Sequence, residues 1–241
     1  MDRVHLHNNV RKGIVNIMKK SSLQSSSGSP LESMFRVWGW IVLAWAIYRY
    51  AFHLPEWIDE FIVKPMIFVA PVLFYVRRIE KRGVSTIGIT GKNIFTSIYI
   101  GLGFGLLFAI EGIAANFIKY GQLQFVPIAA FEQYGLGLML LLSLATAASE
   151  EILSRGFVFG RIMEAKKSLP YAAVLSTAMF ALLHIPILVT SLKLHGVTLL
   201  LFFVTDIALG LINSVLYYNT KSLVAPILVH IFWNMTVAMY L

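Results

Sequence analysis

The residues best suited to chemistry lie in one apolar stretch in the second half of the sequence. Glu150, Glu151 and Arg155 follow a leucine-rich run and precede more apolar residues. On a helix, Glu151 and Arg155 are four residues apart and can form an ion pair, whereas Glu150 projects about 100° away. A carboxylate with no cation beside it in a low-dielectric site readily takes up a proton. We therefore predict Glu150 as a general base and Glu151–Arg155 as a supporting ion pair; simple helix-locking and packing roles are the alternatives.

Two further pairs of residues occur at helical spacing in apolar sequence. Phe180 precedes His184 by four residues, and His230 precedes Asn234 by four, so each pair shares one helix face. We expect Phe180 to support the site. Helical bundles build sites from side chains on facing helices. The four other histidines lie in the tail, in a loop or at a segment end, and we do not expect them in the site.

This set of side chains suits the hydrolysis of an amide by an activated water. Glu150 and His184 can hold and deprotonate a water, while His230 and Asn234 can donate hydrogen bonds to the oxyanion that forms. No covalent intermediate is needed. Because the chain contains no cysteine, a cysteine nucleophile and a thiolate metal site are excluded.

A metal site is the rival interpretation of the same residues. Glu150, His184 and His230 form a common zinc set with an open fourth position. However, the sequence has no His-Glu-x-x-His motif, and the three ligands come from three helices. The residues alone leave the choice open; we expect no cofactor, with zinc as the alternative.

The composition places these residues in a membrane. The 241 residues are 58% hydrophobic and only 13% charged, with a mean hydropathy of +0.74. Soluble proteins are about 45–50% apolar and about 25% charged. The net charge of +8 then serves to orient the chain in the bilayer. The sequence has no basic stripe on a soluble module, so we expect no nucleic-acid partner.

Seven hydrophobic segments are predicted, each close to the roughly 20 residues that span a bilayer. They lie at 35–54, 57–76, 94–118, 135–162, 170–189, 197–217 and 222–241. The fold is therefore expected to be an all-α, polytopic transmembrane bundle. Residues 1–34 form a basic tail with an amphipathic stretch over 1–20 and a Ser-rich linker. Lys64-Pro65 and Pro71 in the second segment suggest a kinked or partly re-entrant helix.

The basic residues predict the orientation of the chain. With the N-terminus in the cytoplasm, fifteen of the 20 Lys and Arg residues fall in cytoplasmic parts, and Arg155 lies within a segment. The outer set contains only Arg49, Lys64, Lys119 and Lys193. This bias agrees with the positive-inside rule, so we expect a cytoplasmic N-terminus and an outer C-terminus.

The three motifs, in this order, resemble a known family. Glu150-Glu151-x-x-x-Arg155, Phe180-x-x-x-His184 and His230-x-x-x-Asn234 look like the signatures of the CAAX-protease and bacteriocin-processing (CPBP) intramembrane proteases, also called type II CAAX endopeptidases. The resemblance covers about residues 135–241. Further matches to the family pattern are Gly210, Tyr217, Thr220, Leu223 and Pro226, and departures from it are Ser154 and Ser214.

The resemblance carries its own expectations. It implies that Glu150 and His184 activate the water, that His230 and Asn234 bind the oxyanion, and that Glu151 and Arg155 support this geometry. It also implies a site that opens to the cytosolic side and favours a metal-free, glutamate-based mechanism.

The sequence therefore predicts an intramembrane endopeptidase, a multi-pass protein of a prokaryotic cell membrane that acts on a membrane-associated peptide or protein. Two alternatives remain at this point. One is a transporter that uses the ionisable residues as a proton or ion relay. The other is a non-catalytic immunity or scaffold protein with the same fold.

Overall fold

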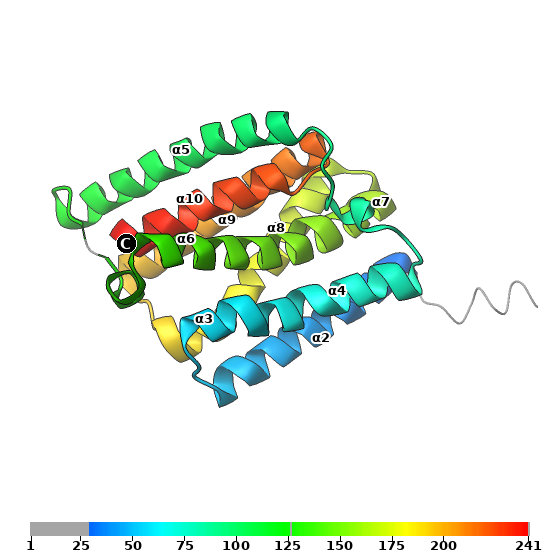
Figure 1. The fold of residues 1–241 in the computed structure, drawn as a ribbon, viewed down its shortest axis with the longest axis horizontal. Coiled ribbons are helices and arrows are strands. Elements are labelled where there is room, and N and C mark those ends of the chain that lie inside the picture. Colours follow the sequence, from blue (N-terminus) through cyan, green and yellow to red (C-terminus); the bar gives the residue numbers. More distant parts are fainter. Residues whose placement is uncertain (1–28, 126, 241) are drawn as a thin grey trace, which may run out of the picture.

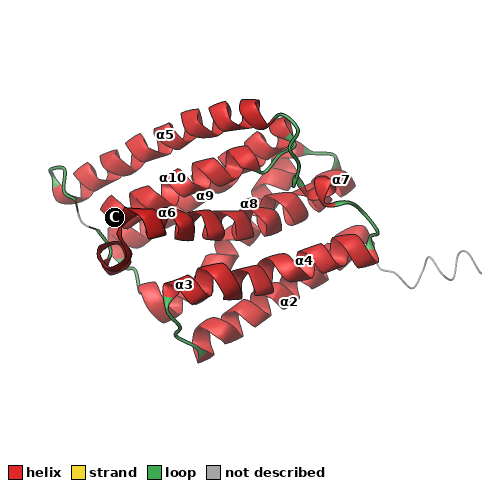
Figure 2. Ribbon diagram, in the orientation of Figure 1, coloured by secondary structure: helices red, strands yellow, loops and turns green. Residues whose placement is uncertain are grey.

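The computed structural model describes residues 29–125 and 127–240, and within them every regular element is a helix (Figures 1 and 2). The predicted amphipathic stretch of residues 1–20 lies outside the described residues. In chain order the elements are α2 (Pro30–Ala51), α3 (Glu56–Ile58), η1 (Asp59–Val63), η2 (Pro65–Val69), α4 (Ala70–Phe74), η3 (Tyr75–Ile79), η4 (Val84–Ile87), α5 (Ile94–Tyr120), α6 (Ala129–Glu151), η5 (Ile152–Phe159), α7 (Gly160–Lys166), α8 (Leu169–Ile187), η6 (Leu188–Leu192), α9 (Gly196–Thr220) and α10 (Val224–Tyr240).

The seven predicted segments correspond to seven helical stretches, several of which join two or more of these elements, and α6 is kinked at Gly135, whose φ is 69° and ψ 174°. The first stretch begins at Pro30, before its predicted start at residue 35, because a capping box fixes its N-terminal end. The Glu32 backbone N–H donates to Ser29 Oγ at 3.2 Å, and the Glu32 carboxylate accepts from the Ser29 backbone N–H at 2.7 Å. Pro30 follows at the first helical position, where its missing N–H costs nothing.

The second stretch, residues 56–79, is helical throughout rather than re-entrant. Its prolines are accommodated by wide π-helical turns, in which each N–H bonds to the carbonyl five residues earlier. The Lys64 N–H bonds to the Asp59 carbonyl in this way, and the Ala70 N–H bonds to the Pro65 carbonyl. Figure 1 shows α3 and α4 as parts of one rod that lies beside α2.

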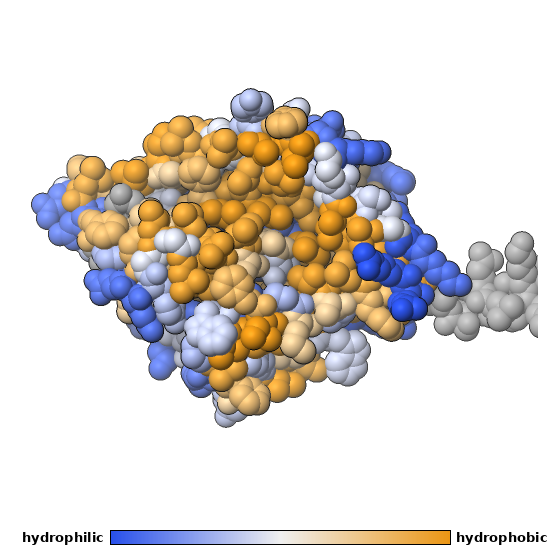
Figure 3. All heavy atoms as spheres, viewed as in Figure 1, coloured by the Kyte–Doolittle hydropathy of each residue, from blue (hydrophilic) through white to orange (hydrophobic). Residues whose placement is uncertain are grey.

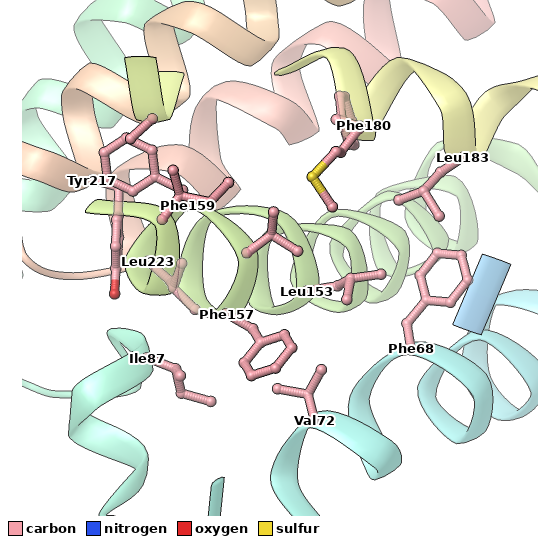
Figure 4. Close-up of a cluster of buried hydrophobic side chains, with 14 of the residues drawn as sticks. Phe68, Val72, Ile87, Leu153, Phe157, Phe159, Phe180, Leu183, Tyr217 and Leu223 are labelled. Atoms are coloured by element: carbon pink, nitrogen blue, oxygen red, sulfur yellow. The ribbon is translucent and has the colours of Figure 1, made fainter. Parts of the chain in front are cut away.

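The helices pack as a bundle in which α10 has a central place. It contacts α5, α6 and α9, while α8 contacts α9 and α2. The close approach of α5 to α10 depends on glycine. A Cβ at Gly105 would collide with the Phe232 ring, and one at Gly112 would collide with Thr236. The buried core, part of which is drawn in Figure 4, is densest around η5.

The surface agrees with a membrane location. Over residues 29–125 and 127–240, four stretches are long and apolar enough to cross a bilayer, namely Ile94–Tyr120, Phe131–Lys166, Leu169–Leu192 and Gly196–Thr220, and Val224–Met239 is a shorter apolar helix. Figure 3 shows a broad hydrophobic band over the middle of the molecule, with hydrophilic residues towards both ends. The predicted all-α, polytopic membrane fold is therefore confirmed.

Candidate active site

Glu150 and Glu151 lie where α6 passes into the π-helical turns of η5. π-helical turns are frequent at functional sites because they change the direction of side chains within a helix. Both side chains are buried, and Glu151 has no exposed surface. Their different directions give the two carboxylates separate surroundings, as the sequence predicted.

Glu151 is the centre of a buried polar network. Its Oε1 accepts hydrogen bonds from His230 Nδ1 at 2.9 Å and from Asn213 Nδ2 at 2.9 Å. Arg155 Nη1 lies 3.2 Å from the same oxygen, so the predicted ion pair is present. A buried carboxylate is tolerated only when it is paired and hydrogen-bonded. Glu151 thus joins η5, α9 and α10 through one atom.

Glu150 has a cationic partner that the sequence analysis missed. Lys64 Nζ lies 2.9 Å from Glu150 Oε1 and 2.8 Å from Glu60 Oε2. Lys64 was predicted as part of the second segment and counted with the outer basic residues; its side chain is buried within the 56–79 helix. The expectation that Glu150 lacks a cation is therefore wrong. An adjacent ammonium group stabilises the ionised carboxylate.

The second oxygen of Glu150 faces both predicted histidines. Its Oε2 is buried and has no hydrogen-bond partner among the described residues, and it lies 3.8 Å from His184 Nε2 and 3.7 Å from His230 Nε2. These separations are too long for direct hydrogen bonds, but a water can bridge groups at such distances. The structure therefore brings Glu150, His184 and His230 together around one oxygen.

Asp206 on α9 lies on the far side of His184. Its Oδ2 is 3.7 Å from His184 Nδ1. Asp206 is fully buried, and within the described part of the chain neither of its oxygens is hydrogen-bonded. The same Nδ1 is 3.2 Å from the Phe180 carbonyl oxygen. Asp206 is not among the residues predicted for the site, although an ionisable residue within a predicted span is a signal for function.

Phe180 packs in the middle of these charged groups. Its ring lies edge-on to His184 at 4.8 Å and to His230 at 5.9 Å between centroids. The Arg155 guanidinium lies over the same ring, 4.3 Å from its centroid, a cation–π geometry. The aromatic ring therefore holds both imidazoles and the arginine in fixed positions.

Glu150, His184, His230 and Asn234 line one cavity of about 170 Å³. The apolar part of its lining includes Trp45, Phe68, Leu183, Phe202 and Trp233. All four predicted catalytic residues are thus brought together, with the predicted supporting residues Glu151, Arg155 and Phe180 packed beside them. Such a cavity, mostly apolar with a few convergent polar groups, is typical of a ligand site.

The residues fit a metal poorly. Within the described residues, no group of three or more His, Asp or Glu side chains has a geometry that could hold a metal ion. Lys64 already places a positive charge 2.9 Å from Glu150, where it would repel a cation bound by that carboxylate.

Comparison with known proteins links this geometry to a family. Residues 131–236 match the model of a family described as type II CAAX prenyl endopeptidase Rce1-like. The family resemblance is confirmed. The Rce1-like segment contains every site residue on α6, η5, α8, α9 and α10, whereas Lys64 lies outside it. No curated protein and no solved structure gives a significant match. At the level of the family, the match supports an intramembrane protease.

Proposed function

We propose that this protein is an intramembrane endopeptidase that hydrolyses a peptide bond of a membrane-associated peptide or protein. The observation that supports this most strongly is the position of Glu150 Oε2. It is buried, unpartnered and within 3.8 Å of two imidazole nitrogens. That is the arrangement expected around an attacking water.

Glu150 acts as the base in this proposal. It takes one proton from the bound water as the hydroxide forms a bond to the peptide carbonyl carbon. The tetrahedral intermediate then collapses, the C–N bond breaks, and Glu150 returns the proton to the leaving amine. His184 holds the water through Nε2, which accepts its second O–H. Both products leave without a covalent bond to the protein.

The Phe180 carbonyl and Asp206 together favour one tautomer of His184. The Phe180 carbonyl oxygen lies within hydrogen-bond distance of Nδ1 at 3.2 Å, and the Asp206 carboxyl group lies 3.7 Å from the same nitrogen. The ring proton is therefore held on Nδ1, and Nε2 keeps its lone pair for the water. Asp206 touches neither water nor substrate in this scheme and is a positioning residue.

Asn234 and His230 stabilise the oxyanion. The Asn234 amide is a donor at any pH, whereas His230 already uses Nδ1 towards Glu151. His230 therefore donates through Nε2 only when the ring carries a second proton.

The proposed site works without a metal. Lys64 supplies the positive charge that keeps Glu150 ionised between turnovers, so no step needs a bound cation. Lys64 also holds Glu60, which accepts a hydrogen bond from Thr146 at 2.5 Å at the wall of the cavity.

A comparison of membrane peptides tests the proposed function whatever the identity of the substrate. Cells that express the wild-type protein are compared with cells that express Glu150→Gln, which keeps the side-chain shape but cannot take up a proton. Glu132→Gln, at an exposed position on the same helix, is the matched control. We expect cleavage products in the wild type and in Glu132→Gln that are missing in Glu150→Gln. Identical peptide sets in all three would contradict the proposal.

A further inference from the structure

Two tryptophans line the catalytic cavity, and they differ in how their indole N–H groups are used. Trp45 on α2 donates its Nε1–H to the Leu183 carbonyl at 3.2 Å. Trp233 on α10 is also buried, with 7% of its surface exposed, but its Nε1 has no hydrogen-bond partner among the described residues. Both side chains belong to the wall of the cavity that contains Glu150. Trp233 therefore brings an unused donor to the candidate active site.

The position of Trp233 on α10 gives it a place of its own in the cavity. Four residues of this helix recur at the spacing of one face and line the catalytic cavity, namely His230, Trp233, Asn234 and Val237. Adjacent residues on a helix project about 100° apart. Trp233 and Asn234 therefore present their donors to different parts of the cavity, and a peptide bound there meets them at different atoms.

Neighbouring aromatic rings hold the Trp233 indole in place. It lies edge-on to His230, with 5.9 Å between ring centroids, and to Phe202, with 6.0 Å. Phe202 in turn lies edge-on to His184 at 5.6 Å. Aromatic pairs prefer such edge-to-face arrangements. Packing therefore fixes the unpaired N–H beside both imidazoles of the site.

The chemistry of the indole N–H defines what it can bind. The group donates a hydrogen bond and cannot accept one, and a buried donor without an acceptor costs free energy. Its ligand must therefore carry an acceptor. Glu150 Oε2 is an unpartnered acceptor in the same cavity, but in the proposed mechanism it binds the water. A peptide main chain supplies a neutral carbonyl oxygen at every residue, and a neutral group enters an apolar cavity more readily than an ion does.

We infer that Trp233 is a substrate-binding residue whose indole N–H donates to a main-chain carbonyl next to the scissile bond. The inference rests on the proposed function, because that function makes the ligand a peptide. The carbonyl that Trp233 holds does not react, so the hydrogen bond is the same before and during hydrolysis. Its loss then raises KM and leaves kcat unchanged. Asn234 and His230 act on the reacting carbonyl, so their loss lowers kcat.

A kinetic test removes only the N–H of the indole. Trp233→benzothienylalanine, introduced by amber-codon suppression, replaces the indole nitrogen with sulfur and keeps the two fused rings. Trp40→benzothienylalanine is the matched control, because Trp40 on α2 is 71% exposed. With a peptide that the wild type cleaves, we expect the change at Trp233 to raise KM about two- to tenfold, as loss of one hydrogen bond does. An unchanged KM, or a lower kcat at the same KM, would overturn the inference.

A binding measurement separates this inference from the protease proposal. It uses the Glu150→Gln protein, with an isotope label on the indole nitrogens, and acetyl-trileucine amide as an uncharged peptide probe. We expect the probe to move the indole N–H proton signal of Trp233 downfield in NMR spectra, because a new hydrogen bond forms. The signal of Trp45 should stay in place, because its N–H is already bonded to Leu183. Loss of one signal in a Trp233→Phe sample assigns the resonance.

A Trp233 signal that stays in place at the highest probe concentration would overturn the inference, as would equal movement of the Trp45 and Trp233 signals. This measurement does not depend on hydrolysis. If the wild type fails to cleave peptides but the Trp233 signal moves, only the protease proposal is contradicted. If the wild type cleaves peptides and the signal does not move, only the role of Trp233 is contradicted.

Discussion

Lys64 Nζ lies 2.9 Å from Glu150 Oε1, so a residue of the first half of the chain contacts the site in the Rce1-like segment. The contact joins the 56–79 helix to α6, and both side chains are buried. Glu60 lies one helical turn before Lys64 and binds the same ammonium group. Lys64 therefore neutralises part of a site that otherwise holds several carboxylates.

Lys64→Met should lower kcat strongly and change KM little. It removes the cation that keeps Glu150 ionised, but it leaves the rest of the cavity in place. Breaking a buried ion pair also costs about 3–5 kcal/mol of stability, so the yield should fall as well. Steady-state kinetics on matched amounts of folded protein separate the two effects. Lys64→Arg should have a kcat between those of Lys64→Met and the wild type. The control Lys166→Met, at an exposed position of α7, should have the wild-type kcat. A fully active Lys64→Met protein would remove Lys64 from the mechanism.

Arg155→Ala should destabilise the fold as well as abolish activity. The substitution leaves Glu151 buried without its cation, which costs about 3–5 kcal/mol. The measurement is the thermal unfolding midpoint in detergent. Arg82→Ala is the control, since Arg82 pairs with Glu164 at the surface and exposed pairs contribute about 0–1 kcal/mol. Equal midpoints for Arg155→Ala and the wild type would refute the structural role of the pair.

Asp206→Asn should reduce kcat, but by less than removal of the general base does. Loss of a general base lowers the rate by about a hundredfold to ten-thousandfold. Asparagine keeps the size of Asp206, but it can donate to His184 Nδ1 and so favour the wrong tautomer. The expected signature is a lower kcat with KM unchanged, together with an altered His184 imidazole signal in NMR spectra of the labelled protein. An unchanged His184 signal would show that Asp206 does not control this ring.

Local spacing was sufficient to predict part of the site. Glu151 and Arg155 are neighbours on one helix, so their pairing follows from the sequence alone. Glu150 and Lys64 are brought together by the packing of distant helices. The position of Lys64 inside the predicted second segment does not reveal which carboxylate it faces. Asp206 was detectable as a charge inside a predicted span, but only the fold shows that it faces His184.

The fold was predictable for a similar reason. Each span is encoded locally as a run of apolar residues, so the number of helical stretches and their approximate limits could be read from the sequence. The start of α2 differs from its predicted position because the Ser29 cap and Glu32 lie in polar sequence outside the apolar run.

Chelator treatment should leave the activity of the purified protein unchanged. Lys64 occupies the place beside Glu150 where a catalytic cation would otherwise act. The rate is measured before and after incubation with a strong chelator, and again after zinc is added. A loss that zinc restores would replace the metal-free mechanism with a zinc site at Glu150, His184 and His230.

The most direct test of the central claim is the hydrolysis rate of purified Glu150→Gln, reconstituted in lipid with a peptide that the wild type cleaves. Glutamine preserves the volume of the side chain and its contact with Lys64, but it cannot accept the proton of the attacking water. The account predicts a rate lower by about a hundredfold to ten-thousandfold, with the unfolding midpoint close to that of the wild type. Cleavage by Glu150→Gln at the wild-type rate would contradict it.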